Sequence, residues 1–229
     1  MEFLIREDAR FPRHESVLNG KKALFCGDSI CAAAVYDYKE CILWGWAGRI
    51  SAATGVRYIN KGRDGASLST CRGENRILKQ IEACKDEKFD VVCLHGGVND
   101  AWDSWVVGKM SDSCDLADFD TNTCAGGLEE LFYYAKKFFP DSKLCFVANY
   151  ATPSSKIGRL ANMDEYFEQI VAICKKWGVP CLDLYHDEAF AQTFKVKEKI
   201  NTADFVHPNG PGYDLLYQPI GKFIEGLFD

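Results

Sequence analysis

Two segments far apart in the chain carry the residue types of a nucleophile and its base. Ser29 follows a short apolar run, and Asp204 precedes His207 by three residues near the C-terminus. A serine hydroxyl is a weak nucleophile unless a base lies within hydrogen-bond reach. The bend around Asp204 and His207 is stiffened by Pro208, so the carboxylate can accept from one ring nitrogen and leave the other free as a base. These residue types fit acyl transfer through a serine.

Two further segments could donate hydrogen bonds to a negatively charged oxygen. Residues 60–67 contain Gly62 and Gly65, and glycine lets the backbone approach a ligand and point an N–H at it. Residues 96–100 contain Asn99, whose side-chain amide can donate to a developing oxyanion. With the first two segments, they complete the set of parts that serine acyl transfer needs.

Each of these segments also has a purely structural interpretation. Asp28 and Ser29 are good helix caps, so their turn could be no more than the start of a helix. Residues 60–67 fit an ordinary strand-to-helix turn, and Asn99 can simply shape a turn. We expect Asp28 and Asp100 to brace their turns.

The other histidines are weaker candidates for the base. His95 ends an apolar run, where a packed core residue is expected, and His14 lies in a polar N-terminal segment where we expect exposure. His186 is the nearest rival of His207. Its adjacent acids, Asp187 and Glu188, favour solvated side chains over an aligned pair.

Composition narrows the class of protein. The 229 residues carry a net charge of −6 and no basic block, which argues against a nucleic-acid partner. No apolar run approaches the ~18 residues of a membrane span or forms a signal-peptide core. The 11 cysteines are scattered without a C-x-x-C pair, so we expect reduced, buried thiols and no zinc site. The expectation is a cytoplasmic enzyme that needs no cofactor or metal and acts on a small-molecule ester.

Short, continuous apolar runs are typical of strands buried on both faces of a parallel sheet. They lie at residues 23–26, 56–59, 91–94, 144–148 and 179–182. Apolar residues at helical spacing occur between them, at residues 43–54, 75–85, 125–139 and 162–176, with a closing helix at 212–228. Gly55 and Gly178 are placed to end two of these helices. The alternation predicts an α/β sheet with helices on both faces, in one domain over residues 21–229 after an N-terminal extension at 1–20.

The segment at residues 101–123 interrupts this alternation of predicted strands and helices. It has no strong periodicity, and Trp102 and Trp105 lie near an acidic run. Long loops inside compact domains are often functional, and ligands of open α/β sheets bind beyond the carboxyl ends of the strands. We therefore predict Trp102 and Trp105 as substrate-binding residues, with the alternative that they only anchor the loop. Asp28, next to Ser29, is a further candidate for binding substrate besides bracing its turn.

The four segments resemble the sequence blocks of the SGNH (GDSL-like) hydrolases. The correspondences are Gly27-Asp28-Ser29 with block I, Gly65 with the block II glycine, Gly97-Val98-Asn99-Asp100 with the G-x-N-D of block III, and Asp204-x-x-His207 with the D-x-x-H of block V. Ile30 stands where the family usually has Leu, and Asp64 precedes the block II glycine. The blocks occur in the family's order and span most of the chain.

The resemblance implies a flavodoxin-like three-layer α/β/α sandwich around a parallel sheet of about five strands. It also implies that Ser29 attacks an ester carbonyl, that His207 takes and later returns the proton, and that Asp204 orients His207. The backbone N–H groups of Ser29 and Gly65, with the Asn99 side chain, would bind the oxyanion. A G-x-S-x-G hydrolase does not fit, because no glycine lies two residues after Ser29.

Three hypotheses about the substrate and the function remain. Short-acyl esters of carbohydrates are favoured, because residues 107–112 and the following loop loosely resemble SGNH proteins thought to act on sugars. A lysophospholipid or acyl thioester would need an extended apolar groove, and the sequence shows no exposed amphipathic segment to supply one. A non-catalytic flavodoxin-like binding module would not need the Asp204–His207 pair, and Asp64 would repel a phosphate from the glycine loop.

Overall fold

The five apolar runs form one central, fully parallel sheet. The structure is a computed structural model that describes residues 2–33, 39–102, 105–152, 163–194 and 200–229. The strands are β1 (Lys22–Cys26), β2 (Arg57–Asn60), β3 (Val91–Gly96), β4 (Lys143–Ala148) and β5 (Cys181–Asp183). Their order across the sheet is β2-β1-β3-β4-β5, which is the flavodoxin-like order. The predicted fold class is confirmed.

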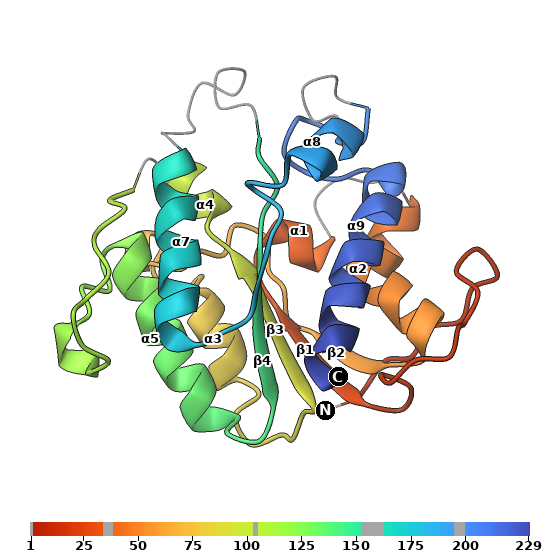
Figure 1. The fold of residues 1–229 in the computed structure, drawn as a ribbon, viewed down its shortest axis with the longest axis horizontal. Coiled ribbons are helices and arrows are strands. Elements are labelled where there is room, and N and C mark those ends of the chain that lie inside the picture. The colour runs from red at the N-terminus through yellow and green to blue at the C-terminus, as the bar shows by residue number, and fades with distance from the viewer. Residues whose placement is uncertain (1, 34–38, 103–104, 153–162, 195–199) are drawn as a thin grey trace.

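Helices cover both faces of the sheet and give the molecule three layers (Figure 1). On one face, α2 (Lys39–Thr54) packs against α9 (Gly210–Glu225), and on the other lie α3 (Ile77–Glu82), α5 (Cys124–Phe138) and α7 (Met163–Trp177). The short helices α1 (Ser29–Ala32), α4 (Val98–Trp102) and α8 (Glu188–Phe194) lie at the end of the sheet where the strands finish. Single 3₁₀ turns are η1 (Thr70–Arg72), η2 (Leu116–Asp118) and η4 (Gly226–Phe228).

The predicted helices occur close to their expected positions. Gly55 and Gly178 directly follow α2 and α7 with φ of 79° and 58°, as the sequence indicates. Residue 162, the predicted first residue of one helix, and residues 103 and 104 of the loop at 101–123 lie outside the described residues. The helix predicted from residue 75 begins only at Ile77, because Arg76 is extended and forms an isolated bridge with Ser67.

The central strands are buried on both faces, as their continuous apolar runs require. All residues of β3 are buried, and most of the described cysteines are buried free thiols. The N-terminal segment lies against this domain: Leu4 bridges to Tyr58 on the edge strand β2, and His14 Nε2 lies 3.0 Å from Glu225 Oε1 in α9. Within the described ranges, no helix is both long and apolar enough to cross a bilayer.

Candidate active site

Ser29 lies on the first turn after β1. It begins α1, and Asp28 caps that helix by accepting a hydrogen bond from Ile30 N–H at 2.9 Å. Gly27 must lack a side chain, because a Cβ there would come within 2.7 Å of the His95 carbonyl oxygen. Ser29 is only 6% exposed. The turn therefore fixes the serine at the carboxyl end of a central strand.

A hydrogen-bonded chain joins Ser29, His207 and Asp204. The Ser29 Oγ lies 2.8 Å from His207 Nε2, and His207 Nδ1 lies 2.8 Å from Asp204 Oδ2. With its proton on Nδ1, the imidazole donates to the carboxylate and accepts from the serine hydroxyl through Nε2. This arrangement can draw the proton from Ser29 as its oxygen attacks a carbonyl carbon.

Asp204 is held in its ionised form. Its burial would raise the pKa, but hydrogen bonds from the side chain and backbone of His207 and from the Val206 N–H outweigh that effect. The pKa of Asp204 therefore lies well below its ordinary value of 3.8. A carboxylate beside Nδ1 is suited to stabilising a positive charge on the imidazole ring.

The turn that carries Asp204 and His207 is closed on itself. Thr202 and Pro208 form an antiparallel bridge, and the Ala203 N–H donates to the His207 carbonyl at 2.8 Å. Backbone bonds inside the turn thus fix the position of the imidazole relative to the carboxylate.

Two tyrosines join this turn and α9 to the rest of the site. Tyr150, just after β4, donates its hydroxyl hydrogen to the Val206 carbonyl. Tyr213 of α9 donates to the Ile30 carbonyl of α1 at 3.0 Å. Ser29 and His207 are 178 positions apart in the sequence, and these two contacts help to bring them together.

Gly65 lies on the loop after β2 and lines the same pocket as Ser29. Its φ of 71° is in the left-handed region, which favours glycine. A Cβ at this position would also lie 2.7 Å from Arg72 Nη1. No hydrogen bond of the described residues uses the Gly65 N–H, so this group is available to a ligand.

Asn99 and Asp100 follow β3 and have different surroundings. Asn99 lines the pocket and donates one amide hydrogen to the Ala66 carbonyl at 2.9 Å, which leaves the second for a ligand. Asp100 is completely buried. It accepts from Leu68 N–H at 2.9 Å and from the N–H and hydroxyl of Ser69 at 3.0 and 2.5 Å, while burial raises its pKa. Asp100 therefore braces the loop that carries Gly65.

A pocket of about 220 Å³ contains the candidate residues from all four segments. Its lining consists of Ser29, Asp64, Gly65, Arg72, Val98, Asn99, Trp102, Asp204, Val206 and His207. Trp102, a predicted substrate-binding residue, thus lines the same pocket as Ser29. Asp64 and Arg72 were not predicted to line it, because a charged residue in a loop carries no sequence signal for the direction of its side chain. A larger hollow of about 570 Å³ lies between the N-terminal segment, α2 and α9, away from these residues.

Two residues predicted to bind substrate lie outside this pocket. Asp28 is 1% exposed and accepts from the Ile30 N–H, so its position is that of a brace beneath Ser29. Trp105 is 37% exposed, and its indole N–H donates to the Asn122 carbonyl. The lining of the pocket therefore includes only one of the two tryptophans.

The remaining histidines are not paired with Ser29. His95 is 2% exposed and its Nδ1 lies 3.3 Å from Asp28 Oδ1, in the core as expected. The Nδ1 of His186 lies 2.7 Å from Asp183 Oδ2, so His186 does have an aligned acid, contrary to expectation. Asp183 is not among the acids considered from the sequence, although its Asp-x-x-His spacing repeats that of Asp204 and His207. His186 does not line the pocket.

The described ranges contain no group of three or more His, Cys, Asp or Glu side chains arranged to hold a metal ion.

A flavodoxin-like sheet with a hydrogen-bonded serine, histidine and aspartate beyond its strand ends is the architecture of an SGNH-type hydrolase. The chain belongs to the GDSL-like Lipase/Acylhydrolase family, whose model matches residues 25–215. That range includes all four segments that carry the candidate residues. A comparison with curated protein sequences found no match.

Solved structures with the same fold cover almost the whole chain. A protein from Lactobacillus plantarum superposes with a TM-score of 0.75 at 21% identity, over 91% of this chain and 98% of the other. A protein described as a GDSL-like lipase from Bacteroides ovatus superposes with a TM-score of 0.67 at 16% identity, over 90% of this chain and 98% of the other. An acetylxylan esterase from Geobacillus stearothermophilus superposes with a TM-score of 0.62 at 19% identity, over 91% of this chain and 96% of the other. At these identities the likeness establishes the fold.

Proposed function

We propose that the protein is a serine ester hydrolase that cleaves short acyl esters, with acetyl esters of carbohydrates as its substrates. The observation that carries the proposal is the 2.8 Å distance between Ser29 Oγ and His207 Nε2, with His207 in turn bonded to Asp204. Contact between Ser29, His207 and Asp204 on the wall of one pocket supports the roles of nucleophile, base and orienting acid that we propose for them.

The reaction proceeds through an acyl-enzyme. As Ser29 Oγ bonds to the ester carbonyl carbon, His207 takes the hydroxyl proton, and the carbonyl oxygen becomes an oxyanion. The backbone N–H groups of Ser29 and Gly65 and the Asn99 amide donate to that oxyanion. The ester C–O bond then breaks, and the leaving alkoxide takes the proton from His207. Water, deprotonated by His207, then attacks the acyl-serine. The bond between the acyl carbon and Ser29 Oγ breaks, Ser29 Oγ takes the proton back from His207, and the carboxylic acid leaves.

The size and lining of the pocket support a small acyl group and a polar alcohol. Drug-sized ligands occupy pockets of roughly 300–1,000 Å³, and this pocket measures about 220 Å³. Trp102 offers an aromatic face, and Asp64 and Arg72 offer hydrogen-bonding groups to sugar hydroxyls. The similarity in fold to an acetylxylan esterase supports the same substrate class.

A panel of esters tests the proposal. It contains p-nitrophenyl esters of increasing chain length, an acetylated xylo-oligosaccharide, a lysophospholipid and an acyl-coenzyme A thioester. We expect the acetyl ester and the acetylated sugar to be hydrolysed fastest, and Ser29→Ala to abolish hydrolysis without unfolding the protein. Ser142→Ala is the matched control, because Ser142 donates to the Phe89 carbonyl at the opposite end of the sheet.

Other outcomes decide against parts of the proposal. Preference for the long-chain ester or the thioester would replace the substrate class and keep the reaction. Hydrolysis that persists in Ser29→Ala would remove Ser29 as the nucleophile. No hydrolysis in any arm would favour a non-catalytic binding module.

A further inference from the structure

The peptide unit between Asp64 and Gly65 is held from one side by a side chain. Asn75 Nδ2 donates to the Asp64 carbonyl oxygen at 2.9 Å. That carbonyl and the Gly65 N–H belong to the same peptide plane. In a trans peptide the C=O and the N–H point in opposite directions, and the described residues contain no cis peptide bond. A bond that fixes the carbonyl on the Asn75 side therefore fixes the N–H on the other side.

Sterics alone do not decide which way this peptide faces. A peptide flip would change the sign of φ at Gly65, which is now 71°, and glycine adopts either sign readily. The hydrogen bond from Asn75 to the Asp64 carbonyl favours the observed orientation, because a flipped peptide would lose it. In this orientation the N–H points away from Asn75. Gly65 lines the pocket beside Ser29, whereas Asn75 is not part of the lining.

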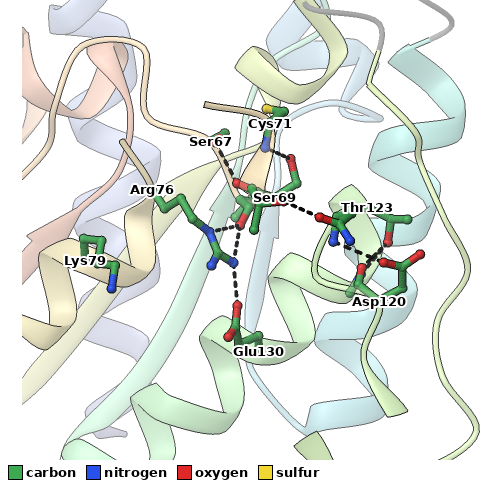
Figure 2. A network of polar contacts seen from close by, with 12 residues as sticks. Ser67, Ser69, Cys71, Arg76, Lys79, Asp120, Thr123 and Glu130 are labelled. Carbon is green, nitrogen blue, oxygen red and sulfur yellow. Dashed lines mark hydrogen bonds and ion pairs between the residues drawn. The ribbon is translucent and has the colours of Figure 1, made fainter. Parts of the chain in front are cut away.

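Asn75 is itself firmly placed. Its backbone N–H donates to the Arg72 carbonyl at 3.1 Å, and its carbonyl accepts from the Ser67 N–H at 3.0 Å. The next residue, Arg76, donates from Nη2 to the Leu68 carbonyl oxygen at 3.2 Å and to Glu130 Oε2 at 2.5 Å (Figure 2). The donor therefore projects from a segment that is braced on both sides.

The side-chain amide of Asn75 is used for its N–H donor, since its oxygen makes no hydrogen bond in the described part of the chain. Asn75 Oδ1 is buried and has no hydrogen-bond partner within the described ranges, which is unfavourable for a carbonyl oxygen. Exchanging the amide oxygen and nitrogen would place Oδ1 against the Asp64 carbonyl, oxygen facing oxygen, so the donor must point at Asp64. Arg72 Nη1 holds the next carbonyl, that of Gly65, at 3.3 Å. Both peptides that flank the glycine are thus held by side chains.

We propose that Asn75 is a positioning residue, which orients the Gly65 N–H toward the oxyanion of the reacting ester. This inference rests on the proposed esterase function. Asn75 touches neither substrate nor reacting atoms. It acts through one peptide plane, and its contribution appears when negative charge develops on the carbonyl oxygen.

The test compares Asn75→Ala and the isosteric Asn75→Asp with Ser142→Ala and the unmodified protein. Both Asn75 variants lose the donor, and the carboxylate of Asn75→Asp also repels the Asp64 carbonyl. We expect kcat for the acetyl ester to fall by about 10-fold or more, approaching the effect of losing one oxyanion donor, while KM changes little. Asn75→Gln, which keeps an amide donor, should recover part of the loss.

A second measurement separates positioning from a merely structural effect. A phenylboronic acid forms a tetrahedral adduct with Ser29 that imitates the oxyanion intermediate. Its affinity should fall in the Asn75 variants by about the same factor as kcat/KM, while the melting temperatures of the soluble variants explain none of the loss. If Asn75→Ala does not fold, the isosteric Asn75→Asp provides the same comparison.

The possible failures are distinguishable. Unchanged kcat and unchanged boronic acid affinity in Asn75→Asp would overturn the role of Asn75 and leave the esterase proposal intact. A loss of activity that merely follows the fraction of unfolded protein would also overturn it. If the unmodified protein hydrolyses no ester, or Ser29→Ala remains active, the proposed function itself fails, and the inference about Asn75 fails with it.

Discussion

The side-chain amide of Gln80 is hydrogen-bonded in both directions to the backbone of Gly27. Gln80 Oε1 accepts from the Gly27 N–H and Nε2 donates to the Gly27 carbonyl, each at 2.8 Å. β1 ends one residue before Gly27, so the amide of Gln80 takes the place of a strand neighbour. Through this contact α3 supports the turn that carries Ser29.

Gln80→Leu should destabilise the protein and slow catalysis. The Gly27 N–H would be left buried without a partner, at a cost of about 1–3 kcal/mol, and the turn before Ser29 would lose its support. Urea unfolding gives the first effect and kcat for an acetyl ester the second. Gln192→Leu, on the exposed surface of α8, is the control. Equal stability of the two variants would show that Gly27 does not depend on Gln80.

Asp204→Asn should lower kcat by about 10⁴-fold, as expected when the orienting acid of such a chain becomes an amide. The amide can donate to Nδ1, which places the ring proton on Nε2, facing the hydroxyl of Ser29. Steady-state kinetics with a chromogenic acetyl ester measure the effect. The second Asp-x-x-His pair offers the matched control, because Asp183→Asn makes the same change outside the pocket. A similar loss in both variants would mean that the effect is not specific to the base.

Asp204 should also contribute to stability in a pH-dependent way. Burial raises its pKa, but the hydrogen bonds from His207 outweigh this and hold the pKa below the ordinary value. The contribution is therefore fully present above the unfolded-state pKa of about 3.9 and is lost as the pH falls through the lower folded-state value.

Urea unfolding of the unmodified protein and Asp204→Asn at a series of pH values tests this effect. The difference in unfolding free energy should shrink as the pH falls below about 4. Asp100, whose pKa burial raises, is present in both proteins, so its titration cancels in the difference. A difference that stays constant down to about pH 2 would contradict the assignment.

Asn99→Ala should reduce kcat by about 10²–10³-fold if its amide donates to the oxyanion. The substitution also removes the bond to the Ala66 carbonyl, so the melting temperature must be followed alongside. An increase confined to KM would instead make Asn99 a residue that binds the ground-state substrate.

The sheet and the positions of the main candidate residues are predictable from the sequence for a simple physical reason. Strands buried on both faces must be continuous apolar runs, and parallel strands bring their carboxyl ends to one edge. Ser29, Gly65 and Asn99 each follow such a run, so they had to lie near one another.

The contacts that support the site are not predictable in this way. Gln80 and Gly27 are 53 positions apart, and nothing in the pattern of α3 distinguishes a glutamine that clamps a backbone from one that faces solvent. Glu129 is completely buried because Lys176, 47 positions later, pairs with it. Such pairs arise only when packed helices bring the partners together.

Asp204 and His207 lie on one turn that is closed by its own backbone bonds, so this pair is held together locally. The backbone bonds that shape it begin and end within a few residues, while the nucleophile and the glycine loop are built by other parts of the sheet. If the proposed function holds, replacing this one turn by an inert connection would remove proton transfer, while Ser29, Gly65 and Asn99 lie on other segments. Under the proposed function, an exchange confined to this turn would separate ester binding from ester cleavage.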